Sequence, residues 1–149
     1  MQALCQVDSL ADAFAAQLDE FLADDGAPAV AIDYARRLVN TFSEHREAID
    51  AALQSAAENW QLSRMALVDR NVLRVAACEL SHSHDVPPAV AINEAVDIAG
   101  AFGSAESGGF VNGVLDALRK NIAANSAAGA ASHADPPEAT AQSSSGSAD

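Results

Sequence analysis

Apolar residues recur three and four positions apart through most of this chain, and this spacing limits its fold more than any other feature. Leu10, Phe14, Leu18 and Leu22 form one such stripe. Side chains at this spacing share one face of an α-helix, whereas a half-buried strand alternates apolar and polar residues, a pattern that this sequence lacks. Alanine, the strongest helix former, is also abundant. The sequence therefore predicts an all-α fold.

Helix-breaking and helix-capping residues divide the body into about seven predicted helices, counting a short first one. The breaks are expected at Gly26 with Pro28, at Ser43 acting as an N-cap, after Trp60, at Pro87 with Pro88, and between Gly103 and Ser107. The helices between them are expected over Leu10 to Leu22, from Ala27 through Phe42, from Ser43 through Ala56, over Leu67 to Ser81, from Pro88 to Gly103, and from Ser107 onward. Connections of a few residues imply antiparallel neighbours in a compact bundle.

A change in composition marks a domain boundary near residue 123. The remainder, residues 123–149, consists mainly of Ala, Ser, Gly and Pro and has no large apolar residue. Such a segment buries too little to offset the entropy lost on ordering. We expect one helical domain over residues 1–122 and a disordered, acidic tail over residues 123–149.

The formal net charge of −13 excludes a chain that holds nucleic acid through a large basic patch, because only eight residues are Lys or Arg. Three of the acidic residues lie in the tail, so the body still carries −10 (−13 plus 3). No secretory signal or membrane-spanning stretch is visible, and the two cysteines fit neither a disulfide framework nor a zinc motif. We expect a soluble, cytoplasmic protein.

Two helical stretches interrupt their apolar series with polar or flexible residues. In FGSAESGGFVNGVLDAL these are Asn112 and Gly113, and in PPAVAINEAVDIA they are Asn93 and Glu94. A glycine inside a helix costs about 1 kcal/mol relative to alanine, which predicts that another helix packs against Gly113. Asn112 either bonds across that contact or faces outward toward a ligand. We expect the two interruptions to form one shared polar contact.

No arrangement of residues indicates catalysis or a cofactor. His82, His84 and Asp85 form an H-x-H-D spacing, but the end of a helix also favours histidine and no further ligand is apparent, so we expect no metal site. Arg70 and Arg74 are four residues apart on one helix and either meet a phosphate or, as we expect, pair with carboxylates such as Asp69.

DRNVLRVAACEL, DVPPAVAINEAVDIAGAFG and SGGFVNGVLDAL, in this order and spacing, resemble the C-terminal half of the transcription antitermination factor NusB family. The similarity is strong over about residues 60 to 120, including a Trp60-x-Leu62-x-Arg64 lead-in, and extends more weakly to QALCQVD at the start. It implies an all-helical fold of two packed subdomains without enzymatic activity. It also implies binding of boxA RNA together with the small-subunit ribosomal protein NusE, within an antitermination complex on RNA polymerase that supports rRNA transcription.

The chain departs from the family pattern in its positive charge. NusB proteins commonly carry an arginine-rich segment before the QALYQxD-like stretch, whereas this chain starts at MQALCQVD. Either the protein lacks that segment or its start codon was assigned too late. The family also tends to have lysines where this chain has Gly100 and Gly109. Fewer phosphate contacts weaken RNA binding, so we expect the chain to depend on a basic ribosomal-protein partner.

The resemblance also suggests individual site residues. Ser107, Phe110 and Asn112 would face RNA at the start of the last helix, where free N–H groups suit phosphate and an aromatic ring can stack on an unpaired base. The alternative gives them structural roles: Ser107 as a cap, Phe110 in the core and Asn112 between helices. Asp116 would tune the local field.

Two further residues are assigned to the partner. Glu79 is the leading candidate for a contact with the ribosomal protein, its alternative being a solvated acidic residue. Cys5 replaces a common family tyrosine close to the partner surface.

Two other functions remain open. The chain would be a protein-interaction module of this fold that has lost RNA binding, or a domain related to the NusB-like part of rRNA cytosine methyltransferases, although it has no room for a methyltransferase domain.

Overall fold

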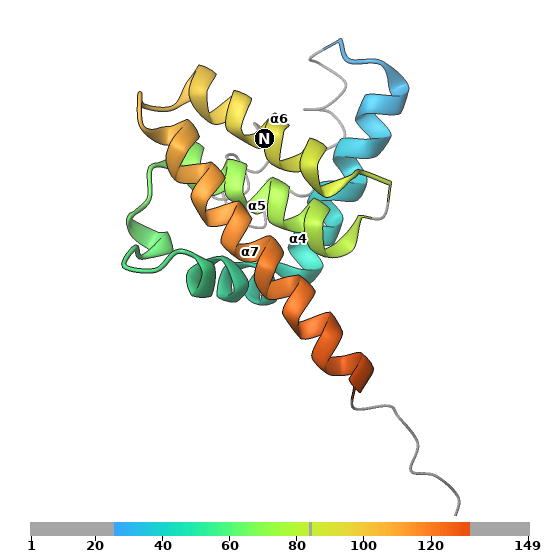
Figure 1. The fold of residues 1–149 in the computed structure, drawn as a ribbon. Helices are drawn as coiled ribbons and strands as arrows, with labels where there is room; N and C mark the ends of the chain where they lie inside the picture. Colours follow the sequence, from blue (N-terminus) through green and yellow to red (C-terminus); the bar gives the residue numbers. More distant parts are fainter. Residues whose placement is uncertain (1–25, 84, 132–149) are drawn as a thin grey trace, which may run out of the picture.

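The computed structural model describes residues 26–83 and 85–131. Their regular secondary structure is helical, with no strand among these residues. The helices are α4 (Ala29–Ala56), the 3-10 helix η1 (Leu62–Arg64), α5 (Leu67–His82), α6 (Pro88–Phe102) and α7 (Ser107–Ala131). Figure 1 shows α5 lying between α4 and α6, with α7 crossing the bundle. The predicted all-α fold is confirmed in this part of the chain.

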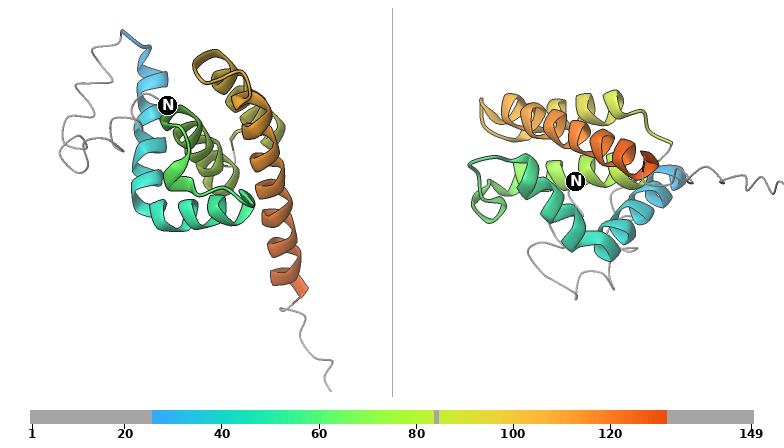
Figure 2. Two further views of the ribbon diagram at one scale, coloured as in Figure 1. Left: turned by 90° about the vertical axis from the view of Figure 1, so that its left-hand side faces the viewer. Right: turned by 60° about the horizontal axis from the view of Figure 1, so that its bottom comes forward.

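The helix α4 replaces two of the predicted helices. The Ser43 hydroxyl donates to the Val39 carbonyl at 2.9 Å, so Ser43 does not begin a new helix. This bond to the residue four positions back keeps Ser43 inside the helix, and such bonds often accompany a bend. His45, two residues on, has non-helical angles (φ −114°, ψ 15°), and α4 changes direction visibly (Figure 2). The predicted role of Ser43 as an N-cap is therefore wrong, but a break is present two residues later, where the kink at His45 joins two helical arms.

About seven helices were predicted, whereas the described residues contain four α-helices. Besides the merging of two predicted helices in α4, the predicted short first helix and the helix over Leu10 to Leu22 lie outside the described residues. The division into two subdomains also involves those residues and stays a prediction.

Both ends of α6 follow the predicted signals. Pro88 is the first residue of α6, where its missing N–H costs nothing, and Pro87 lies just before the helix. Gly103 ends α6 and donates its N–H to the Ala99 carbonyl at 2.8 Å. Its φ of −100° does not require glycine. A Cβ at Gly103 would instead lie 2.6 Å from the Ala99 carbonyl oxygen and collide with the Ser107 side chain, so the tight turn needs glycine.

One apolar core joins all four helices. Its largest fully buried side chains include Phe42 of α4, Leu73 of α5, and Leu115 and Leu118 of α7. The helix α6 contributes the small side chains of Ala91, Ala95 and Ala99, together with Ile92. Small residues allow α6 to pack closely on its neighbours α5 and α7.

The helix α7 continues to Ala131, past the domain boundary predicted at residue 123. Its residues 123–130 are exposed, and Figures 1 and 2 show this end projecting from the bundle. The Ser126 hydroxyl donates to the Ile122 carbonyl at 3.0 Å, and the many alanines favour continuation of the helix. Residues 132–149 lie outside the described residues, so disorder in that part stays a prediction. Among the described helices, none combines the length and apolar character needed to cross a membrane.

Candidate functional site

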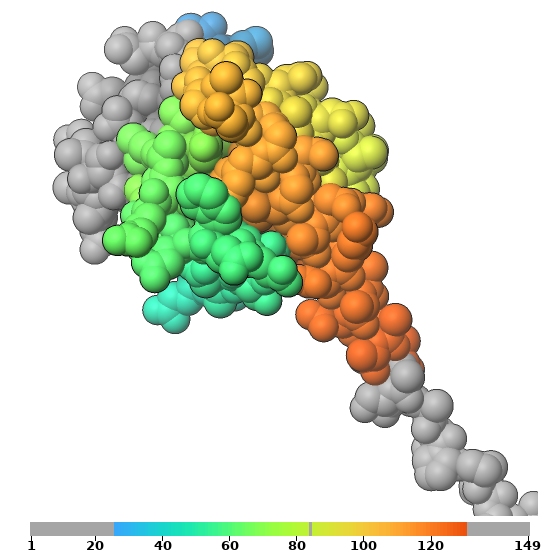
Figure 3. Space-filling view, turned by 60° about the vertical axis from the view of Figure 1, so that its left-hand side comes forward, coloured from blue at the N-terminus to red at the C-terminus, as the bar shows by residue number. Residues whose placement is uncertain are grey.

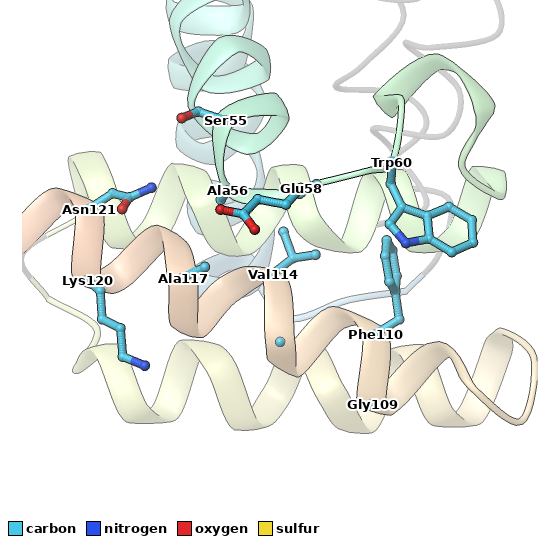
Figure 4. Close-up of a pocket in the computed structure, with 12 residues that line it drawn as sticks. Ser55, Ala56, Glu58, Trp60, Gly109, Phe110, Val114, Ala117, Lys120 and Asn121 are labelled. Carbon is cyan, nitrogen blue, oxygen red and sulfur yellow. The ribbon is translucent and has the colours of Figure 1, made fainter.

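An aromatic cleft lies between the end of α4 and the side of α7. It is lined by residues 55–58 and Trp60 on one side and by α7 residues between Gly109 and Asn121 on the other, with a volume of about 500 Å³. Figure 4 shows Trp60 and Phe110 together at one end, and Lys120 and Asn121 toward the other. In the space-filling view, the segment after α4 lies directly against α7 (Figure 3). We call this feature the aromatic cleft.

Trp60 and Phe110 contact each other across the cleft, with ring centroids 5.4 Å apart and an interplanar angle of 63°. This edge-to-face geometry is one of the favoured arrangements of an aromatic pair. Phe110 is half-buried and packs against the core, whereas Trp60 is 57% exposed. The exposed ring of the pair is therefore Trp60, which the sequence indicated only as part of the family lead-in.

The loop that carries Trp60 is fixed by the side chain of Gln54. Its Nε2 donates to the Trp60 carbonyl at 2.7 Å, and its Oε1 accepts from the Leu62 N–H at 2.9 Å. Asn59 adopts a left-handed conformation with φ of 68°, which asparagine tolerates better than most residues. No pattern in the sequence pointed to Gln54, because its two partners lie six and eight residues further along the chain in an irregular segment.

The structure separates the three residues predicted to form one RNA-facing group. Ser107 is buried, and its hydroxyl accepts from the Ser104 N–H at 2.9 Å, so it shapes the α6–α7 turn and does not reach solvent. Phe110 faces the aromatic cleft. Asn112 is exposed, but two residues along a helix correspond to a rotation of about 200°, which directs it away from the Phe110 side. The three side chains therefore do not share one surface, and their assignment to RNA stays a prediction.

Gly113 and Asn112 do not form the helix contact that their positions suggested. A Cβ at Gly113 would meet nothing within 4 Å, because Gly113 is exposed at the aromatic cleft. The helix α6 instead approaches α7 at Gly108, where an added Cβ would lie 3.6 Å from the Val96 carbonyl oxygen. Asn93 and Asn112 are both exposed, so the predicted shared polar contact is also wrong.

Asp116 pairs with both basic residues of α7. Its carboxylate oxygens lie 3.0 Å from Arg119 Nη2 and 2.7 Å from Lys120 Nζ. Hydrogen bonds from Lys120 and Arg119 hold the pKa of Asp116 below its usual value. Asp116 thus restrains Lys120, the one basic residue that lines the aromatic cleft, and an electrostatic role for Asp116 agrees with this geometry.

Arg70 and Arg74 differ in their surroundings. Arg74 is 4% exposed and forms a two-pronged ion pair with Asp50, at 2.8 Å for each bond, while its guanidinium lies 5.3 Å from the centre of the Phe42 ring. The predicted intramolecular pairing of Arg74 is confirmed, but the partner is Asp50 and not Asp69. Arg70 donates to the Ser63 carbonyl at 3.4 Å.

Glu79 lies in a second depression, between α4, α5 and α6, with a volume of about 400 Å³. We call it the carboxylate groove; its walls are largely apolar and its acidic residues are Glu79 and Glu94. The Tyr34 hydroxyl donates to the half-buried Glu79 carboxylate. Burial raises the pKa of Glu79, and the hydrogen bond from Tyr34 opposes that shift. Glu79 is thus not a simple solvated residue.

The remaining predicted residues fall elsewhere. Cys5 and His84 lie outside the described residues. His82 stacks on His45 with ring centroids 4.2 Å apart, which joins the end of α5 to the kink of α4. Among residues 26–83 and 85–131, no three His, Cys, Asp or Glu side chains converge as metal ligands would.

Comparison with known proteins decides the family. A model described as the NusB family matches residues 1–120. The chain belongs to the NusB family. A transcription antitermination protein NusB from Anaeromyxobacter dehalogenans is 42% identical over 123 residues, covering 82% of this chain and 86% of that protein. The family consists of transcription antitermination proteins and is not enzymatic.

Solved structures of family members share the fold. NusB of T. maritima superposes with a TM-score of 0.70 at 37% identity, covering 80% of this chain and 84% of that one. A second structure, of antitermination factors NusB and NusE in complex with double-stranded RNA, gives a TM-score of 0.72 at 28% identity, covering 80% and 89%. The all-helical NusB-like fold and the role in transcription antitermination expected from the resemblance are therefore confirmed.

Proposed function

We propose that this chain binds boxA RNA together with the ribosomal protein NusE, and that this complex supports antitermination during rRNA transcription. Family membership supports the proposal, as does a NusB relative that has been solved with NusE and RNA. The observation that carries it within this chain is the aromatic cleft, where exposed Trp60 and half-buried Phe110 lie on the same surface as Lys120.

Because the chain is strongly acidic, most of the electrostatic attraction for RNA would come from the partner. With a net charge of −13 and eight basic residues, long-range attraction of phosphate by this chain alone is weak. Asp116 further offsets Lys120 and Arg119. A basic partner would complement the acidic surface, accelerate association and add phosphate contacts of its own.

The carboxylate groove is the proposed contact for that partner. It combines apolar walls with the carboxyl groups of Glu79 and Glu94, which suits a lysine or arginine side chain with its aliphatic stem. Because Glu79 already accepts a hydrogen bond from Tyr34, a partner cation would meet an oriented carboxylate. Cys5 is retained as a proposed partner-contacting residue on the family resemblance alone.

The test measures boxA RNA affinity for the full chain with and without NusE, at several stated salt concentrations. We expect weak binding by the chain alone, and tighter binding with a steeper salt dependence when NusE is present, because more counterions are then released. Tight binding by the isolated chain would contradict the assignment of charge to the partner. Binding of NusE without any gain in RNA affinity would favour the interaction module that has lost RNA binding.

A further inference from the structure

Trp60 is the only tryptophan of the chain, and it is held in solvent rather than in the core. Phe110 meets it edge to face, so the phenyl ring does not occupy a parallel stacking position on the indole. A flat aromatic surface with an open side recognises other flat rings. The geometry therefore provides a platform with a supporting ring behind it.

This platform is fixed before any ligand arrives. The two hydrogen bonds of Gln54 hold the backbone on both sides of the indole, at the Trp60 carbonyl and the Leu62 N–H. A third bond, from the Trp60 N–H to the Ala57 carbonyl at 3.1 Å, closes the loop. A loop that is ordered in advance loses less entropy on binding. Gln54 thus has a position from which it sets the orientation of Trp60.

The charged residues of the aromatic cleft favour the base of a nucleotide at one end and its phosphate at the other. Glu58 lines the cleft between the aromatic pair and Lys120, and its carboxylate disfavours a phosphate nearby while accepting hydrogen bonds from a base amino group. Lys120 and Asn121 offer donors toward the opposite end, where a phosphate is favoured. A base within a duplex is stacked on its neighbours, so the ligand that fits is an unpaired base.

We propose that Trp60 is the platform on which one unpaired base of the RNA stacks, and that Gln54 is the positioning residue that holds it there. The inference rests on the RNA binding proposed above and names the part of the RNA that the aromatic cleft takes. Phe110, for which base stacking was considered from the sequence, supports the indole from its edge.

The experiment combines protein variants with RNA variants. A single-stranded boxA RNA and a series in which one base at a time is replaced by an abasic ribose are titrated with the full chain and NusE, with affinity measured by anisotropy of an end label. Wild type is compared with Trp60→Ala, Trp60→Phe and Gln54→Met, the last keeping side-chain length without the two hydrogen bonds. Val90→Ala is the control, because Val90 is exposed near the start of α6 and does not line the aromatic cleft.

We expect one abasic position to weaken wild-type binding about tenfold, as stacking of a single base commonly does. Trp60→Ala and Gln54→Met should weaken binding to intact RNA and become insensitive to that same position. Trp60→Phe should keep part of the sensitivity, and Val90→Ala all of it. Trp60 fluorescence, read with a tryptophan-free NusE, should be quenched by intact RNA and not by the RNA that is abasic at this position.

Equal abasic penalties in wild type and Trp60→Ala would overturn this inference and leave the RNA-binding function intact. A fluorescence change on adding NusE, with none on adding RNA, would assign Trp60 to the protein partner and overturn it as well. Absence of any RNA binding by wild type with NusE would instead overturn the proposed function on which the inference rests. A loss in Gln54→Met that keeps the abasic sensitivity would remove Gln54 as the positioning residue.

Discussion

Arg74 is the most buried charged residue among those described, and its two bonds to Asp50 join α5 to α4. The side chain of Asp50 is itself only 26% exposed. A guanidinium withdrawn from water costs free energy that the Asp50 carboxylate helps to offset, so loss of Asp50 removes a large part of this compensation. The face of the Phe42 ring, 5.3 Å away, offsets a smaller part.

We expect Asp50→Ala to lower the free energy of unfolding by about 3 kcal/mol, measured by urea denaturation. Asp33→Ala is the matched control, because Asp33 pairs with Arg36 at 2.9 Å on the surface of the same helix. Exposed pairs contribute less than about 1 kcal/mol, so this variant should remain close to wild type. Similar losses in both variants would show that Arg74 does not depend on Asp50.

Two glycines are expected to respond to alanine with opposite signs. At Gly103 an added Cβ would lie 2.6 Å from the Ala99 carbonyl oxygen, so Gly103→Ala should destabilise by about 1–3 kcal/mol through overpacking. At Gly113 the same Cβ meets open space within a helix, so Gly113→Ala should stabilise by up to about 1 kcal/mol. Thermal unfolding of both variants measures the difference, and a destabilised Gly113→Ala would contradict the described packing.

The residue contacts that could not be predicted are those that join distant segments. The Arg74–Asp50 pair spans 24 positions, and Trp60 meets Phe110 from a loop 50 positions earlier in the chain. The sequence indicates that a buried charged residue or a large aromatic residue will have a partner, but it does not identify which residue that partner is. At Gly113 the sequence suggested a contact that is absent. A glycine inside a helix predicted close packing by another helix, but an added Cβ there meets nothing within 4 Å.

At the level of the helices, the Tyr34–Glu79 hydrogen bond joins α4 to α5 at the carboxylate groove. Because burial raises the pKa of Glu79, the folded chain binds a proton more tightly there than the unfolded chain does. The resulting stability is full below the ordinary pKa of 4.5 and is lost as pH rises through the folded value. Neutral glutamine at this position avoids that loss.

We therefore expect the stability of Glu79→Gln relative to wild type to increase as pH rises above 4.5, measured by urea denaturation over a pH series. Tyr34→Phe removes the hydrogen bond that lowers the pKa of Glu79, so the loss of stability should continue to higher pH than in wild type. A constant difference between Glu79→Gln and wild type across the series would contradict burial of the carboxylate.

Helix boundaries could be predicted where the deciding signal is local. Pro88 and Gly103 fixed the ends of α6 because missing N–H groups and the absence of a side chain act within a few residues. Ser43 could not be assigned in this way, because its hydroxyl can either cap a new helix or bond back to the Val39 carbonyl. Packing of both arms of α4 on the rest of the bundle decides between these outcomes.

For the whole molecule, the position of its few positive charges matters more than their number. Asp116 binds Lys120 at 2.7 Å and Arg119 at 3.0 Å, which weakens the attraction of both cations of α7 for a phosphate. The sequence placed Asp116 near an RNA-facing surface, but it did not reveal that one carboxylate engages both side chains. The family resemblance indicated the overall function, whereas this arrangement required the structure.

We expect Asp116→Asn to strengthen RNA binding in the presence of NusE several-fold at low salt, because Lys120 becomes available to phosphate and one counterion more is released. Asp33→Asn changes the net charge equally on α4, outside the lining of the aromatic cleft, and should have a smaller effect. The measurement is RNA affinity as a function of salt. Equal effects of the two variants would reduce the role of Asp116 to net charge alone.

The helix α7 is packed on the core over one part of its length and exposed to solvent over the other. Around Leu115 and Leu118 it packs on the core, whereas residues 123–130 are exposed. Backbone hydrogen bonds in such an overhang open by fraying from the free end and need no unfolding of the bundle. Amide hydrogen exchange should therefore accelerate progressively from Leu118 toward Ala131, so that this single helix records a gradient of local opening.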